Sequence, residues 1–113
     1  MCPFCADFEK ASSGWLAQYA EQGKVAIRYS PISILDEGSD GTEYSTRAAN
    51  ALAVVLDTAG PEAAKKFHDE LYAQQPAEGS AGLSDDQFIA LAVASGAERS
   101  SVEQPIRSLE FAG

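Results

Sequence analysis

Basic residues, histidine and cysteine are all scarce in this chain, and each scarcity excludes a class of function. Lysine and arginine number 8 against 17 aspartate and glutamate residues, which gives a formal net charge of −9. Nucleic acids and anionic membranes are bound through basic patches, so we expect neither as a partner. No apolar run approaches the roughly 18 residues needed to span a membrane. One histidine and two cysteines are too few for a four-ligand zinc site, and we expect no metal.

The two cysteines lie within the first five residues, where the longest helical pattern also begins. Aromatic and small residues recur at helical spacing and line one face, which predicts a helix from Pro3 to Gln22 with Gly23 as its stop. Pro3 occupies the first helical position, where its missing N–H costs nothing. The residues of this stripe are Phe4, Phe8, Ala11, Trp15 and Tyr19, and we expect Trp15 and Tyr19 to be buried in the core.

The position of the cysteines at a helix N-terminus has a chemical consequence. Residues three apart are neighbours on a helix, so the Cys2 and Cys5 sulfurs can close a small disulfide ring. The positive end of the helix dipole stabilises a thiolate, which should lower the pKa of Cys2 below its free value of about 8.5. Cys2 would then attack, and Cys5, half buried under the first turn, would resolve the mixed disulfide. The hypothesis is a redox-active dithiol that needs no further cofactor.

Other interpretations of the pair remain open at this stage. A structural disulfide normally links more distant segments, because a short loop removes little entropy from the unfolded chain. Zinc binding and an inert CxxC are further alternatives. The single histidine, His68, is most simply a solvated or capping residue, since a role as base for Cys2 would require the later helices to fold over the motif.

The rest of the chain predicts one strand followed by helices. Alternation of Val25, Ile27 and Tyr29 with polar or small residues predicts a strand over Lys24–Ser30, ended by Pro31. The polar stretch 36–41 predicts a loop. Helices are expected over Thr42–Ala59, from Pro61 to about Gln75, from a capping box at Ser84–Gln87 to about Ser95, and from Ser100 or Ser101 onward. A single strand cannot satisfy its own backbone, so its partners lie outside this segment or in a homodimer.

These features together resemble the bacterial DsbA family of thioredoxin-fold thiol–disulfide oxidoreductases. The amino-acid composition, rich in Ala, Glu and Ser, is similar to that of actinobacterial members. The resemblance rests on Cys2-Pro3-Phe4-Cys5, the aromatic helix behind it, the strand, and the helical block up to Phe111. It implies an α/β, thioredoxin-like fold for the single domain 1–113. In that fold, residues 1–35 would form the active-site helix and following strand, and residues 42–113 the helical insertion.

The resemblance also implies an activity, partners and a location. Cys2 would be the exposed nucleophile and Cys5 the resolving thiol, with Pro3 and Phe4 tuning the potential. The expected reaction is disulfide exchange with unfolded or cysteine-containing secreted proteins, outside the cytoplasm, with a redox partner that reoxidises or reduces the dithiol. The family's leading strand and cis-proline loop are missing, so we expect a segment of a longer protein with targeting information upstream. A reductase or isomerase, or a non-catalytic helical interaction module with a vestigial CxxC, are the alternatives.

Overall fold

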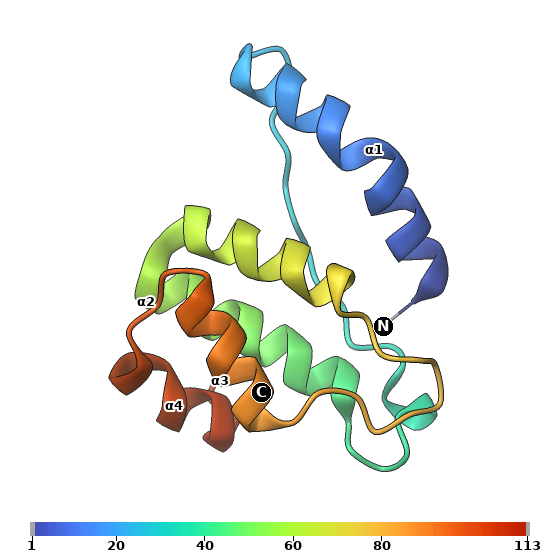
Figure 1. Cartoon of the computed structure of the whole chain (residues 1–113), viewed down its shortest axis with the longest axis vertical. Helices are drawn as coiled ribbons and strands as arrows, with labels where there is room; N and C mark the ends of the chain where they lie inside the picture. The colour runs from blue at the N-terminus through green and yellow to red at the C-terminus, as the bar shows by residue number, and fades with distance from the viewer. Residues whose placement is uncertain (1, 113) are drawn as a thin grey trace.

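The computed structural model describes residues 2–112, and in that range it contains four α-helices and one short 3-10 helix. In chain order they are α1 (Pro3–Glu21), η1 (Asp36–Gly38), α2 (Tyr44–Ala73), α3 (Asp85–Ala94) and α4 (Arg99–Ser108). Figure 1 shows α1 extending away from a bundle formed by α2, α3 and α4. None of these helices is both long and apolar enough to cross a membrane.

Helix α2 consists of two helical halves that meet at Gly60, as the Gly60–Pro61 sequence predicts. Gly60 has φ 83° and ψ 178°, a conformation that no helix contains and that glycine adopts without strain. Pro61 follows and lacks the N–H that would continue the hydrogen-bond ladder. The two halves therefore fold back beside each other, and both contribute buried residues to one core.

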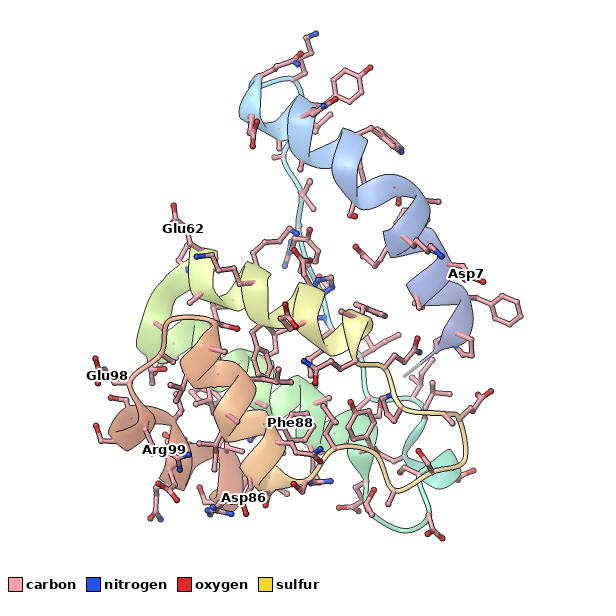
Figure 2. The ribbon with its side chains drawn as sticks, in the orientation of Figure 1. Asp7, Glu62, Asp86, Phe88, Glu98 and Arg99 are labelled. Carbon is pink, nitrogen blue, oxygen red and sulfur yellow. The ribbon has the colours of Figure 1, made fainter. Side chains whose placement is uncertain are left out.

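The hydrophobic core lies between the two halves of α2 and the helices α3 and α4. Its largest fully buried side chains are aromatic or β-branched, and Figure 2 shows Phe88 among these helices while Asp7 and Glu62 project outward. Tyr44 stacks on Phe88 with ring centroids 5.6 Å apart and an interplanar angle of 16°. The core is built from alanine-rich helix faces, which allow close helix packing, together with Val54, Val55, Phe67, Phe88, Ile89, Val102 and Ile106.

Buried polar groups tie the ends of the helices to this core. Asn50, only 2% exposed, donates from Nδ2 to the carbonyl oxygens of Pro105 and Ile106, and its Oδ1 accepts from the Phe111 N–H at 2.8 Å. At the start of α2, the Asp36 carboxylate accepts from the Thr46 N–H at 2.9 Å. This contact satisfies a free donor of the helix and places a negative charge at its positive end.

The expected start of α3 is confirmed. The Ser84 hydroxyl accepts from the Gln87 N–H, and the Gln87 side chain accepts from the Ser84 N–H, which is the reciprocal pattern of a capping box. Arg47 on α2 holds the same helix end through an ion pair with Asp85 at 2.7 Å. Pro105 lies within α4, which remains a helix from Arg99 to Ser108.

The predicted strand over Lys24–Ser30 is wrong. Residues 2–112 contain helices and no strand, so this part of the chain does not have the predicted α/β class. The segment from Val25 to Ile34 is neither helix nor strand, and its backbone makes no hydrogen bond to another backbone group in the described part of the chain. Its side chains alternate as a strand's would, but a strand exists only when its N–H and C=O groups have a partner strand. The helices of this chain cannot supply one.

The prediction that Trp15 and Tyr19 belong to the core is also wrong. Trp15 is 50% exposed and Tyr19 is 43% exposed, and Phe8 of the same stripe is 60% exposed. The only fully buried residue of α1 is Ser12, whose hydroxyl donates to the Phe8 carbonyl one turn earlier. The helical spacing identified the apolar face correctly, but no layer of the described structure covers that face.

Candidate active site

Helix α1 begins where the sequence predicts, so both cysteines occupy its first turn. Cys2 is the N-cap residue in an extended conformation, Pro3 follows at the first helical position, and Cys5 lies one turn into the helix. Both are free thiols. Cys5 is exposed and Cys2 is partly buried, the reverse of the expected order. The reason is that no element within residues 2–112 covers the Cys5 side of this turn, which leaves Cys5 open to solvent.

The two thiols have pKa values displaced in opposite directions. The pKa of Cys2 is lowered, because its sulfur accepts hydrogen bonds first from the Cys5 backbone N–H and then from the Cys5 thiol, with a further one from the Phe4 N–H. The pKa of Cys5 is raised, chiefly because its thiol donates to Cys2 and is partly desolvated, with the negative charges of Cys2 and Glu9 adding to the effect. The reduced pair therefore holds its first negative charge on Cys2 and its proton on Cys5.

This asymmetry predicts the titration of the reduced protein. Cys2 should remain a thiolate at pH values below the ordinary cysteine range, because its lowered pKa must be reached before it takes up a proton. Absorbance near 240 nm, followed over a pH titration, should show this early step in the wild type. Cys2→Ser should lack the step, while Cys5→Ala should keep a Cys2 step that moves to higher pH, because the thiol donor of Cys5 is lost. A single step near the free-thiol value of about 8.5 in the wild type would contradict the prediction.

A cavity of about 570 Å³ adjoins the cysteines and connects them to the helical bundle. The start of α1 lines one side with Cys2 and Cys5, the extended segment contributes Tyr29, and α2 contributes the opposite wall. Ile32 and Ile34 of the same segment also line the cavity, and their exposed fractions are 68% and 72%. The cavity is large enough for one or two side chains of a bound peptide, and its wall is mainly apolar.

His68 of α2 lies in this cavity wall, and the expectation of a solvated histidine is wrong. Its side chain is 13% exposed, with the ring of Tyr29 at 4.6 Å and that of Tyr72 at 5.0 Å between centroids. His68 Nε2 lies 3.9 Å from Oε1 of Glu9 on α1. The extended segment crosses between α1 and α2 and brings Tyr29 over the imidazole, which sequence spacing alone could not show.

Glu9 and Tyr72 are site residues that the sequence reasoning missed. Glu9 follows Cys5 by four positions and lies on the same face of α1, a spacing that was available in the sequence. Tyr72 follows His68 by four positions on α2. Burial raises the pKa of the Tyr72 phenol first, and the charges of Cys5, Glu9 and Cys2 raise it further. Tyr72 therefore stays a neutral hydrogen-bond donor within electrostatic reach of both cysteines.

Comparisons with known proteins agree with this arrangement at the level of the family. A protein-family model described as thioredoxin matches residues 1–112. The serine/threonine-protein kinase PknE of Mycobacterium tuberculosis strain H37Rv is 30% identical over 105 residues, which cover 90% of this chain and 19% of the kinase. PknE of Mycobacterium bovis matches with the same identity and coverage. The chain thus spans about a fifth of the length of these curated relatives. No solved structure matches the chain significantly.

Proposed function

Because the chain belongs to the thioredoxin family, in its DsbA-like form, we propose that it exchanges disulfides with protein substrates through Cys2 and Cys5. The observation that carries the proposal is the opposite displacement of the two thiol pKa values in the first turn of α1. A thiolate on Cys2 is both the attacking sulfur and the better leaving group of the pair. Pro3 and Phe4 adjust this balance through the shape of the turn and the Phe4 N–H.

The exchange proceeds in two balanced steps. In the oxidising direction, a substrate thiolate attacks Cys2 of the Cys2–Cys5 disulfide, a substrate–Cys2 bond forms, and Cys5 leaves as a thiolate that takes up a proton. A second substrate thiolate then attacks the substrate sulfur of this mixed disulfide. Cys2 leaves as a thiolate, the substrate gains a disulfide, and two electrons pass to the cysteine pair. A redox partner restores the Cys2–Cys5 disulfide by the reverse chemistry.

We propose the oxidising direction, with secreted, cysteine-containing proteins as substrates in an extracytoplasmic compartment. Support for the direction comes from the stabilised Cys2 thiolate, since stabilising the reduced form makes a dithiol a stronger oxidant. Support for the compartment comes from the resemblance to extracytoplasmic DsbA-like proteins. A disulfide reductase or isomerase of the same family would use the same two residues with a lower reduction potential.

The reduction potential of the pair tests both the activity and its direction. Equilibration in glutathione buffers, followed by acid quenching and counting of free thiols, should give one reversible two-electron transition. A midpoint closer to about −120 mV than to about −270 mV supports an oxidant, and a midpoint near the lower value supports a reductase. A pair that does not interconvert in these buffers would overturn the proposed activity.

The uncovered stripe of α1 favours a second candidate function, a non-catalytic interaction module. Phe4 is 82% exposed and Phe8 is 60% exposed. Large exposed apolar patches on a protein surface often mark sites of interaction with other molecules. The redox titration separates the two functions, because an interaction module with an inert CxxC would show no reversible transition. We favour disulfide exchange, because an inert pair gives no account of the split in thiol pKa values.

A further inference from the structure

We propose that the cavity beside the cysteines contains a cation subsite, formed by Glu9, His68 and Tyr72, which receives a lysine side chain of the substrate protein. The inference rests on the proposed function and deepens it, because it names a class of substrate. It concerns how the substrate is held while its sulfur reacts with Cys2, and it leaves the chemistry of the two thiols unchanged.

The first observation is a carboxylate in the cavity wall that lacks a close partner. The Glu9 side chain is 22% exposed and lines the cavity, whose wall is mainly apolar. Among residues 2–112, the one group within ion-pair distance of this carboxylate is His68 Nε2, 3.9 Å from Oε1. A carboxylate that is partly withdrawn from water gains more from a nearby cation than a fully solvated one does.

The second observation is that His68 presents another acceptor at the same place. Asp69 Oδ1 lies 3.2 Å from His68 Nδ1. A neutral imidazole that donates from Nδ1 to this carboxylate has an unprotonated Nε2, which accepts hydrogen bonds. Nε2 of His68 and Oε1 of Glu9 are then two acceptors 3.9 Å apart. An ammonium group carries three donors and can bond to both atoms, at about 2.8 Å from each.

The third observation is the aromatic surface around these acceptors. The rings of Tyr29 and Tyr72 flank the imidazole at 4.6 and 5.0 Å between centroids, and both tyrosines line the cavity. Aromatic faces attract cations, and the Nζ of Lys65 already lies 5.9 Å from the centre of the Tyr29 ring. Lys65 is paired with Asp69 at 2.5 Å and does not line the cavity, so it does not occupy the subsite.

The charges around the cavity favour a basic substrate side chain over an acidic one. Arg28 also lines the cavity and would attract an acid instead. Arg28 is exposed, however, so water and salt screen its charge more than that of Glu9. The whole chain carries a formal charge of −9, which attracts basic substrates at longer range.

The separation of Cys2 and Glu9 determines where the lysine lies in the substrate sequence. The two residues are seven positions apart along α1 and its N-cap, which is about 10 Å at about 1.5 Å per residue. In an extended peptide, alternate residues lie on the same side about 7 Å apart, and the lysine stem covers the remaining distance. A lysine two positions from the reacting cysteine therefore reaches Glu9, whereas a lysine directly beside that cysteine points to the opposite side.

The test uses reduced peptides that contain one cysteine, with either lysine or glutamine two positions after it. Each peptide is mixed in excess with the oxidised protein at about pH 8, where an ordinary imidazole is neutral. Opening of the Cys2–Cys5 disulfide is followed by acid quenching, alkylation and mass spectrometry. The lysine-to-glutamine rate ratio should be about fivefold larger in the wild type than in Glu9→Gln. Dividing the two ratios removes the effect of lysine on the peptide's own thiol.

Matched controls separate the subsite from general electrostatics. Glu21→Gln makes the same charge change at the exposed far end of α1 and should retain the wild-type ratio. Tyr72→Phe keeps the ring and should keep the ratio, whereas Tyr72→Leu should lower it about twofold. The two Tyr72 variants leave α1 untouched, so they test the subsite even if Glu9→Gln loosens the helix. A peptide with lysine directly beside its cysteine should show no gain that depends on Glu9.

The possible results separate the subsite from the proposed function. Equal rate ratios in the wild type and Glu9→Gln would overturn the cation subsite while leaving the proposed function intact. A glutamate peptide that reacted faster than the glutamine peptide would also overturn it, since Arg28 would then select the substrate. A wild type that reacts with none of the peptides would overturn the proposed function, and the subsite as a substrate site with it.

Discussion

Replacing Cys2 with serine is expected to reduce thiol–disulfide exchange with a reduced, cysteine-containing substrate protein by about 1,000-fold or more. A serine hydroxyl is not ionised near neutral pH and forms no disulfide. The substitution therefore removes the one sulfur that acts both as the attacking group and as the leaving group. The first backbone hydrogen bond of the helix does not depend on the sulfur, because the Ala6 N–H donates to the Cys2 carbonyl oxygen at 3.3 Å. Helix α1 should therefore keep its start. The measurement is the rate at which the substrate protein gains its disulfide.

Cys5→Ser is the matched control for this prediction. It preserves the Cys2 thiolate and removes only the resolving thiol. When it is offered a substrate protein that contains a disulfide, Cys2 attacks one sulfur, the other substrate sulfur leaves as a thiolate, and the Cys2–substrate mixed disulfide should accumulate. Mass spectrometry of the alkylated adduct identifies the sulfur that was attacked. If Cys2→Ser retained wild-type exchange, or if the trapped adduct formed on Cys5 of that variant at the wild-type rate, Cys2 would not be the nucleophile.

Gly82→Ala is expected to lower the free energy of unfolding by about 3 kcal/mol or more, the largest stability effect we predict for a single methyl group. Gly82 has φ +72°, and a Cβ built on it would lie 2.2 Å from Cδ2 and 2.5 Å from Cγ of the Tyr44 ring. The left-handed conformation alone costs a non-glycine residue about 1–2 kcal/mol, and overpacking adds about 1–3 kcal/mol. Tyr44 cannot move aside easily, because its ring is 2% exposed and stacked on Phe88.

Gly79→Ala separates the steric clash from the backbone strain. Gly79 has φ +81°, and a Cβ there would meet nothing within 4 Å. It should lower the free energy of unfolding by only about 1–2 kcal/mol. Denaturant unfolding of both variants gives the comparison directly. Equal losses in the two variants would show that the Tyr44 ring moves aside for the methyl group at no measurable cost, and would contradict the predicted clash.

The two regions of the molecule differ in how they depend on their surroundings. The bundle of α2, α3 and α4 buries its own apolar faces and satisfies its helix ends with Asn50, Asp36 and Ser84. Helix α1 and residues 25–34 leave their large apolar side chains exposed, although the spacing of these side chains is typical of a buried helix and a buried strand. Substitutions in the bundle should therefore act mainly on stability, and substitutions in α1 mainly on reactivity.

Local signals in the sequence were sufficient where the chemistry is local. The start of α1 at Pro3, the break at Gly60–Pro61 and the capping box at Ser84 each depend on residues within one helical turn, and each is confirmed. The displacement of the Cys2 pKa belongs to this group as well. It comes from N–H and S–H donors three positions away at most.

Tertiary structure decided the rest, because the remaining features need two distant segments. The alternation of Val25, Ile27 and Tyr29 is a strand pattern, yet no strand forms in residues 2–112, since a strand depends on a partner that no pattern within it can provide. Trp15 lies on an apolar face, but whether such a face is buried depends on what packs against it. His68 approaches Glu9 only because the chain crosses from α1 to α2, 59 positions later in the sequence. Side-chain type and spacing determine what a residue can do, and the fold determines which residue it meets.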